Sequence, residues 1–411
     1  MSIRKRTWTT AAGEDKTAWV VDYVDQGGKR RLKTFSRKKE ADAFSATAKV
    51  EVREGVHVAD SASATVATAG KLWVATAAAA GLERTTIVSY QSHLDLHIVP
   101  LIGEMRVSAL SIPLLRAFED DLRAASRSPA MIKKVMVSLG SLLADAQERG
   151  LTTRNAVRDI RGRRGRGENR QEKRLKGKLR VGADIPTREE VKALVGALSN
   201  RWRPLLLTAI FTGLRASELR GLRWEDVDLE KREIRVHRRA DRFNAIGKPK
   251  SASSERTVPA PPIVINTLRE WKLACPRATS RRTDPSGKPI MVLDLVFPNG
   301  AGKVEQLNNI VRRGLHPALL AAGVTIETEG LDEQGNHIPA PKYPGIHALR
   351  HFFASWCINR KEDGGLGLPP KVVQERMGHS TITMTMDTYG HLFPRGDDAA
   401  ELAAAETALL G

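Results

Sequence analysis

The side chains most able to do chemistry lie close together near the C-terminal end of the sequence. His347 and Arg350 are three residues apart, a spacing that places both on one face of a predicted helix, away from its apolar stripe. His379 follows a glycine that ends a second predicted helix. Tyr389 directly precedes the glycine that ends a third, which Ser380 is expected to cap. Arginine and histidine bind anions and move protons, and a phenol oxygen can act as a nucleophile. The stretch therefore predicts a site that acts on an anionic group.

Two more basic residues and one acid accompany this stretch earlier in the chain. Arg215 lies in TGLRASEL, at the predicted start of a helix, where the dipole favours an anion. Glu218 follows three residues later, at a spacing that allows it to orient Arg215. Lys250 lies in PKSASSERTVP, in a basic turn that also contains Lys248. Together these residues supply the nucleophile, the cations and the proton-transfer groups that attack on a phosphodiester requires.

The order TGLRASEL, PKSASSERTVP, HALRH, MGHS and DTYGH resembles the catalytic set of the tyrosine recombinase, or phage integrase, family. The resemblance covers the whole chain in domain order. It implies a multidomain protein whose mainly α-helical catalytic domain carries a small β-sheet. It also implies an enzyme that cleaves and rejoins DNA through a 3′-phosphotyrosine intermediate and integrates or excises a phage or another mobile element. Two departures, Ala348 where aspartate is frequent and Met377 where leucine is frequent, remove no catalytic group.

The resemblance also implies which residues transfer the protons. Tyr389 is the nucleophile, and its proton passes toward His347. Lys250 protonates the leaving 5′-oxygen, since it suits the register of the family's lysine better than Lys248 does.

The remaining residues neutralise the charge on the phosphate and bind its oxygens. Arg215 and Arg350 hold the non-bridging oxygens, because a guanidinium stays charged and donates two parallel hydrogen bonds. His379 donates a further hydrogen bond to the phosphate. The resemblance implies neither a metal ion nor a nucleotide as cofactor, because the arginines neutralise the charge that a metal would otherwise carry.

The composition favours a polyanionic partner. The 411 residues carry a net charge of +19 and have room for two or three domains. A membrane surface is the competing partner, but no apolar run approaches ~20 residues. We expect a cytoplasmic, nucleoid-associated protein of a bacterial host, with Cys275 and Cys357 reduced.

Residues 1–60 are expected to form a small α+β module. Strands over 19–25 and 31–35 enclose a turn, and Ser36 is expected to cap a following helix. The module resembles the arm-type DNA-binding domain of integrases. Its hairpin is rich in basic residues, and those predicted to bind DNA are Lys29, Arg30, Arg31 and Lys33.

Three further segments follow. Residues 61–160 show helical periodicity interrupted at Pro100 and Gly150, and resemble the family's core-binding domain. Residues 161–184 are expected to be a basic linker that crosses the DNA backbone, and 185–411 the catalytic domain. The linker residues predicted to bind DNA are Arg161, Arg163, Arg164 and Arg166.

Within the catalytic domain, strands are predicted over 233–238 and 256–258, on either side of the basic turn. Residues 325–344 are polar, acidic and proline-bearing, and are interpreted as an inserted loop.

The implied partner is double-stranded DNA with core-type and arm-type attachment sites, bound by a homo-tetramer. A DNA-bending host factor and an excisionase are further candidate partners, and no membrane is expected. Two alternatives stay open: a type IB topoisomerase-like or chromosome-resolving tyrosine recombinase, and a non-catalytic DNA-binding regulator. The N-terminal module argues against the first, because it implies a second class of DNA site. The complete set of site residues argues against the regulator.

Overall fold

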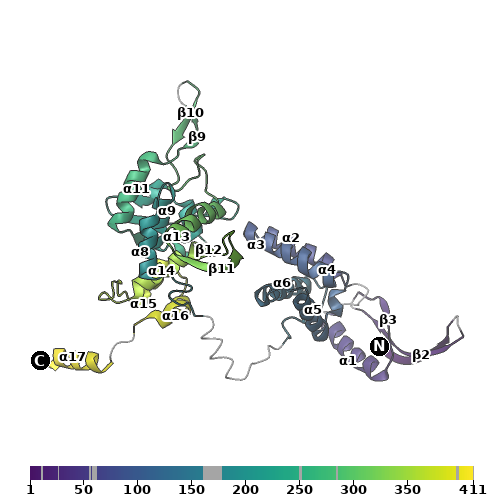
Figure 1. Ribbon diagram of the computed structural model, residues 1–411. Coiled ribbons are helices and arrows are strands. Elements are labelled where there is room, and N and C mark those ends of the chain that lie inside the picture. Colours follow the sequence, from purple (N-terminus) through teal and green to yellow (C-terminus); the bar gives the residue numbers. More distant parts are fainter. Residues whose placement is uncertain are drawn as a thin grey trace. The chain divides into compact units, whose positions relative to one another are not determined.

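The chain folds into two compact units, Met1–Arg164 and Gly165–Gly411 (Figure 1). Each unit is considered by itself. The structure, a computed structural model, describes residues 1–10, 13–25, 27–54, 57, 63–160, 178–249, 252–283, 286–394 and 398–410.

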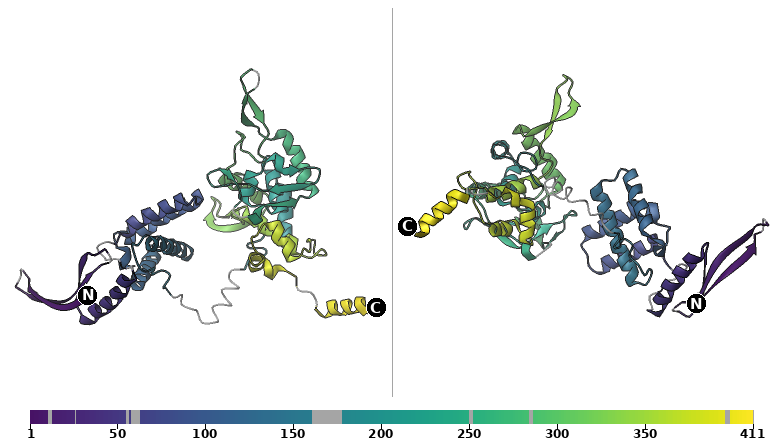
Figure 2. Two further views of the ribbon diagram at one scale, coloured as in Figure 1. Left: turned by 180° about the vertical axis from the view of Figure 1, so that it is seen from behind. Right: turned by 90° about the horizontal axis from the view of Figure 1, so that it is seen from below.

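The first unit begins with an antiparallel sheet that one helix covers (Figure 2). Its strands, in sheet order, are β1 (Ser2–Thr9), β2 (Asp15–Val24) and β3 (Arg30–Phe35), and its helix is α1 (Lys38–Arg53). Val21, Tyr23 and Ala41 are buried between sheet and helix. Because side chains alternate along a strand, Ala18 and Val20 of β2 point to the other face and are buried there. Helix α1 does not cover this face, which is called the open face below.

Two expectations for this region need correction. The sequence predicts β2 and β3 but not β1, whose residues are almost all exposed and polar, so that no apolar alternation marks the strand. Helix α1 begins after Arg37, and the hydroxyl of Ser36 donates to Glu40 and caps no backbone amide. The predicted Ser36 cap is therefore wrong.

The rest of the first unit is helical, as its periodicity predicts. The helices are α2 (Val66–Ala79), α3 (Arg84–His93), α4 (Val99–Ile102), α5 (Ile112–Ala124) and α6 (Pro129–Glu148). Side-chain oxygens of Thr65, Ser111 and Ser128 accept hydrogen bonds at the starts of α2, α5 and α6. The core between the helices is apolar, with Leu139 and Phe118 among its buried side chains.

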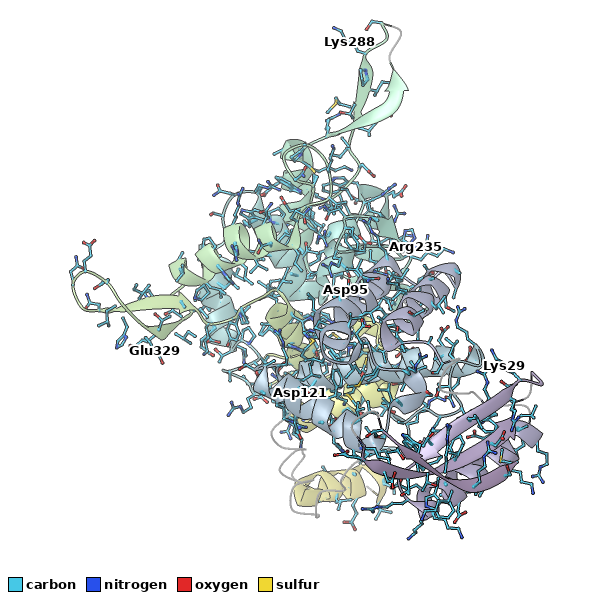
Figure 3. The ribbon with its side chains drawn as sticks, turned by 90° about the vertical axis from the view of Figure 1, so that its right-hand side faces the viewer. Lys29, Asp95, Asp121, Arg235, Lys288 and Glu329 are labelled. Carbon is cyan, nitrogen blue, oxygen red and sulfur yellow. The ribbon has the colours of Figure 1, made fainter. Side chains whose placement is uncertain are left out.

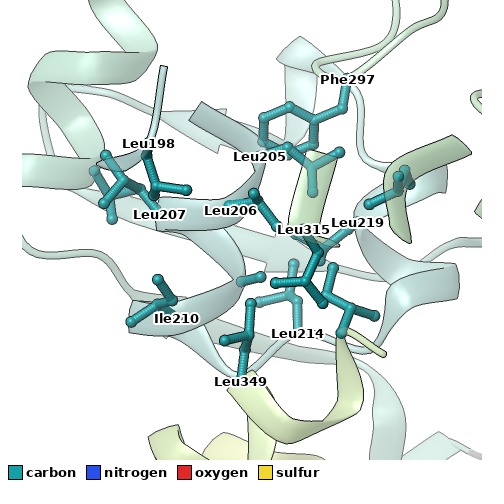
Figure 4. Packing of buried hydrophobic residues seen from close by; sticks show 14 of the residues in the cluster. Leu198, Leu205, Leu206, Leu207, Ile210, Leu214, Leu219, Phe297, Leu315 and Leu349 are labelled. Atoms are coloured by element: carbon teal, nitrogen blue, oxygen red, sulfur yellow. The ribbon is translucent and has the colours of Figure 1, made fainter. Parts of the chain in front are cut away.

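The second unit is mainly helical with small sheets. Its helices are α8 (Arg188–Ala197), α9 (Trp202–Thr212), α10 (Ala216–Gly221), α11 (Pro262–Ala274), α12 (Leu307–Asn309), α13 (His316–Ala321), α14 (His347–Ile358), α15 (Pro370–Met377), α16 (Ile382–Tyr389) and α17 (Asp398–Leu410). Helix α9 is apolar on every side and lies in the core, where Leu206 and Ile210 pack with Leu214 and Leu349 (Figure 4). The core thus fixes α9 against α14, the helix that begins at His347.

The strands described in this unit form one three-stranded sheet and three hairpins. The sheet is β4 (Val227–Asp228), β5 (Glu233–Val236) and β8 (Arg256–Pro259), and the hairpins are β6 (Arg239–Ala240) with β7 (Ile246–Gly247), β9 (Ala278–Thr283) with β10 (Pro289–Val292), and β11 (Thr325–Leu331) with β12 (His337–Pro341). Strands β5 and β8 confirm the two predicted strands. Glu329 on β11 and Lys288 beside β10 stand on two projecting hairpins (Figure 3).

The predicted loop over 325–344 is wrong, since most of it is the hairpin of β11 and β12. Its strands are mostly exposed on both faces, so the sequence has no half-buried alternation to reveal them. Asp332 closes the turn by accepting hydrogen bonds from the amides of Gln334 and Asn336. Among the described residues, no helix is long and apolar enough to cross a membrane.

Candidate active site

A glycine turn places Arg215 at the site. Helix α9 ends at Gly213 with φ of 61°, and a Cβ there would lie 2.3 Å from the ring of Phe353. Arg215 then precedes α10, and its amide donates to Glu218 over 2.8 Å. Its guanidinium donates to the same carboxylate and to the carbonyl of Gly378, each over 2.8 Å. Glu218 therefore orients Arg215, as the spacing predicts.

A second arginine shares this carboxylate. Arg256, the first residue of β8, donates to the two oxygens of Glu218 over 3.2 and 2.9 Å, and to the carbonyl of Arg376. Glu218 is only 2% exposed. Burial works against its charge, but the hydrogen bonds and charges of Arg256 and Arg215 prevail and lower its pKa. Arg256 was missing from the predicted site. The sequence signal that could have identified Arg256 was its position as the first residue of the Arg-x-Val-Pro motif.

Arg350 is the most enclosed cation of the site, at 3% exposure. It donates to the carbonyls of Gly213 and Met377, which close α9 and α15. Burial and the neighbouring charge of Arg215 lower the pKa of Arg350 to about 9, which leaves the guanidinium charged at neutral pH. Arg350 therefore joins two helix ends and brings a fixed positive charge beside Arg215.

His379 and Tyr389 come from the next turn and helix. Gly378 ends α15 with φ of 60°, and Thr381, not the predicted Ser380, caps α16 by accepting from the amide of Met384. The rings of His379 and Tyr389 lie parallel within 4°, with centroids 6.1 Å apart. His379 Nδ1 lies 2.9 Å from the hydroxyl of Thr385. Burial, followed by Arg350, lowers the pKa of His379 to about 4, so the ring is neutral at pH 7.

The hydroxyl of Tyr389 meets a histidine that the sequence did not single out. Tyr389 is 2% exposed, and its oxygen lies 2.7 Å from Nδ1 of His351. The predicted acceptor, His347, is exposed and contacts His351 edge-on, with ring centroids 4.6 Å apart. Burial raises the pKa of Tyr389 to about 12, against the opposing charges of Arg350 and Arg215. The signal for His351 was its place one helical turn after His347.

The structure does not describe all of the other predicted residues. Lys250 and the linker residues Arg161, Arg163, Arg164 and Arg166 lie outside the described residues, and Lys248 is exposed after β7. Lys29 is exposed at the β2–β3 turn (Figure 3). Arg30 lies on the open face of the sheet, paired with Asp22. Arg31 and Lys33 lie on the side of α1, where Arg31 pairs with Asp25 and Lys33 contacts the ring of Phe44.

The structure thus brings six predicted residues together: Arg215, Glu218, His347, Arg350, His379 and Tyr389. In the part of the chain that the structure describes, no three His, Cys, Asp or Glu side chains gather in a way that could hold a metal ion.

The fold and this site define a class, the tyrosine recombinases. Residues 186–395 match the model of the Phage integrase family, and the chain belongs to that family. It is therefore an enzyme of DNA strand exchange.

Relatives and solved structures agree. The "Tyrosine recombinase XerC-like" protein of Caldanaerobacter subterraneus subsp. tengcongensis is 27% identical over 392 residues, which cover 90% of each chain. The transposase from transposon Tn916 of Enterococcus faecalis is 31% identical over 193 residues, 45% of this chain and 41% of that relative.

The Tn1549 transposon integrase, solved with a circular intermediate DNA, matches with a TM-score of 0.58 at 18% identity, covering 85% of this chain and 100% of that one. A lambda integrase tetramer on a Holliday junction matches with a TM-score of 0.53 at 15% identity, covering 92% and 96%. These structures share the fold of the chain.

Proposed function

We propose that this chain integrates or excises a mobile element and that Tyr389 is its nucleophile. The observation that carries the proposal is the convergence of Arg215 and Arg350, both held by helix-end carbonyls, beside the buried hydroxyl of Tyr389. Attack by this oxygen on a DNA phosphodiester forms a 3′-phosphotyrosine and releases a 5′-hydroxyl. The ester retains its energy, so a 5′-hydroxyl from another duplex can reverse the reaction and join the strands.

The surrounding cations suit this attack. Arg215 is about one third exposed, so its guanidinium can contact a phosphate from solvent. Arg350 is buried beside it and adds to the positive electrostatic potential of the site. Both charges are fixed before DNA arrives, and such preorganised donors stabilise a phosphorane-like transition state without reorganising. Arg256 donates to Glu218 and is almost fully buried, so it holds the carboxylate that orients Arg215 and acts as a positioning residue.

The histidines then divide the remaining work. If the hydroxyl of Thr385 donates to Nδ1 of His379, the neutral ring carries its proton on Nε2, where it can donate to a phosphate oxygen. His347, exposed at the start of α14, has access to the DNA side. Lys250, which precedes β8 in the sequence, supplies the proton for the leaving 5′-oxygen.

The element and the assembly are inferred from the relatives. Tn916 and Tn1549 are transposons, and the Tn1549 structure holds a circular intermediate DNA. The lambda integrase structure is a tetramer on a Holliday junction. A homo-tetramer on attachment-site DNA in the bacterial cytoplasm follows by analogy, with a DNA-bending protein and an excisionase as accessory partners.

The open face of the N-terminal sheet is proposed to bind arm-type sites. Strand β1 presents Arg4, Arg6 and Trp8 there, because Ile3 points to the helix side and successive residues alternate. Arg30 of β3 lies on the same face. A twisted sheet with a basic face fits the major groove.

A trapping experiment tests the proposal. The full chain is incubated with a DNA library that contains the sequence flanking its own gene, and denaturing gels report any covalent adduct. We expect an adduct with the wild type and with Tyr343→Phe, a matched control in which a buried tyrosine elsewhere loses its hydroxyl. Tyr389→Phe should bind DNA and form none. An adduct with Tyr389→Phe would show that another residue is the nucleophile.

A further inference from the structure

Three histidines lie at the site, and only two of them, His351 and His379, contact the ring of Tyr389. His379 lies parallel to the phenol ring, and its Nδ1 faces Thr385. His347 is exposed and touches His351 rather than the phenol. His351 alone among the three places a ring nitrogen within hydrogen-bond distance of the nucleophilic oxygen, at 2.7 Å.

We propose that His351 is the proton acceptor for Tyr389 during DNA cleavage and holds the phenol in place before DNA binds. This inference rests on the proposed function and refines it, since the resemblance to the family implied transfer toward His347. His351 is fixed by α14, the helix whose Arg350 joins the ends of α9 and α15. The acceptor and the guanidinium beside the phosphate are therefore positioned by one rigid element.

The protonation states permit this role. Burial, followed by the charges of His347 and Arg350, lowers the pKa of His351 to about 4, while Asp184 acts in the opposite direction. The ring is therefore neutral at pH 7, and in the tautomer that carries its proton on Nε2 the Nδ1 atom accepts a hydrogen bond from the phenol. A bound phosphate adds negative charge beside Arg350 and Arg215, which raises the basicity of His351 when cleavage begins.

Each proton that moves in the reaction has a donor and an acceptor. The O–H bond of Tyr389 breaks as an N–H bond forms at Nδ1 of His351, while the phenol oxygen bonds to phosphorus. The bond from phosphorus to the 5′-oxygen breaks, and that oxygen takes a proton from the general acid, proposed above as Lys250. In the joining step the incoming 5′-hydroxyl returns its proton to the acid, and His351 returns its proton to the departing phenolate.

The test uses variants that separate proton transfer from positioning. In His351→Asn the amide oxygen takes nearly the place of Nδ1, so the variant can accept the hydrogen bond but cannot take up the proton. Single-turnover adduct formation is measured on the trapped DNA site in the full chain, with DNA binding and thermal melting measured alongside. We expect normal binding and a cleavage rate reduced by ~10²-fold or more, within the range of general base catalysis.

A more acidic nucleophile supplies the decisive readout. A fluorinated tyrosine at position 389 releases its proton more readily, so it should restore at least about tenfold of the rate in His351→Asn while changing the wild type little. His347→Asn is the matched control, on the same helix, and fluorination should not rescue it. His351→Ala serves in place of His351→Asn if the latter does not fold.

The outcomes are distinct. A wild-type rate in a His351 variant, or a loss that fluorination does not relieve, overturns the role of His351 and leaves the proposed function standing. Rescue of His347→Asn instead would return the proton to His347. Absence of any adduct from the wild type would overturn the proposed function and this inference together.

Discussion

At the scale of single residues, the site depends on one buried carboxylate between two arginines. Glu218 is charged because Arg256 and Arg215 both donate to it, and these hydrogen bonds replace the hydration that the carboxylate gives up on burial. Replacement of the Glu218 carboxylate by the neutral amide of glutamine would leave two guanidinium groups without a counter-charge in an enclosed site. The catalytic unit therefore relies on Glu218 for stability as well as for the orientation of Arg215.

Glu218→Gln should accordingly lower the free energy of unfolding by about 3–5 kcal/mol at pH 7, measured by urea denaturation. The folded-state pKa is lowered, so the stabilisation is present above the unfolded pKa of 4.5 and is lost as pH falls through the folded value. The gap between wild type and variant should shrink in that acid range. Glu225→Gln, which breaks an ion pair at an exposed carboxylate, should change stability by less than ~1 kcal/mol. Equal losses in the two variants would contradict the assigned role of Glu218.

Arg350→Lys tests whether the site requires the planar guanidinium of Arg350 and not only its charge. One guanidinium spans the carbonyls of Gly213 and Met377, and a lysine ammonium has neither the width nor the fixed geometry to serve both. We expect single-turnover cleavage to fall by ~10²–10³-fold, with DNA binding much less affected. Near-normal cleavage would place Arg350 in a purely structural role.

At the scale of elements, two left-handed glycines set the geometry. Gly213 ends α9 and Gly378 ends α15, and each adopts positive φ where an added Cβ would meet a close neighbour. The turns expose the carbonyls that hold Arg350 and Arg215. Helix ends thus supply the oxygen atoms that fix both cations.

Gly213→Ala should destabilise the catalytic unit for two reasons: a strained backbone, worth about 1 kcal/mol, and contact with Phe353, worth about 1–3 kcal/mol more. Gly323→Ala is the matched control, because its φ is also positive, at +68°, but nothing lies within 4 Å of the added carbon. Urea denaturation should show the larger loss in Gly213→Ala. If both variants lose the same stability, the contact with Phe353 relaxes without cost and the backbone alone requires glycine.

The helices and turns of this site follow from local sequence, whereas its contacts do not. The spacing of His347 and Arg350, the stop at Gly378 and the place of Tyr389 are local patterns, and the structure follows them. The choice between His347 and His351 is not local, since they lie one turn apart and only the approach of α16 decides which one meets the phenol. Likewise, the partners of Arg350 are backbone carbonyls, which carry no sequence signal. Strand β1 escaped prediction for a related reason, because its exposed polar residues pair along β2 without an apolar stripe.

At the scale of the whole molecule, the net charge of +19 is divided among separate surfaces. The N-terminal sheet presents arginines on its open face, and the second unit holds Arg215, which is partly exposed, beside the buried Arg350. The sequence over 161–166, expected to be a linker, carries four more arginines. If Arg161, Arg163, Arg164 and Arg166 bind the core-site backbone, as the sequence predicts, their neutral replacement would leave DNA phosphates there without cations. The log-log salt slope of core-site binding should then fall by about 0.9 for each phosphate that is no longer neutralised, as measured by gel shift over a range of salt.

The last prediction compares the two faces of the N-terminal sheet in the full chain. Arg6 lies on the open face, whereas Lys33 lies on the helix side, where its ammonium is 4.3 Å from the ring centroid of Phe44. If the open face binds arm-type DNA, Arg6→Ala should weaken binding at the distal site and flatten its salt dependence by about 0.9 in log-log slope. Lys33→Ala should chiefly reduce the stability of the module, because it removes a cation–π interaction rather than a cation that faces phosphate. Binding to arm and core sites is measured by gel shift over a range of salt, with thermal melting alongside. A greater loss of distal binding in Lys33→Ala than in Arg6→Ala would assign DNA recognition to the helix side, and equal binding by all three proteins would remove the sheet from recognition altogether.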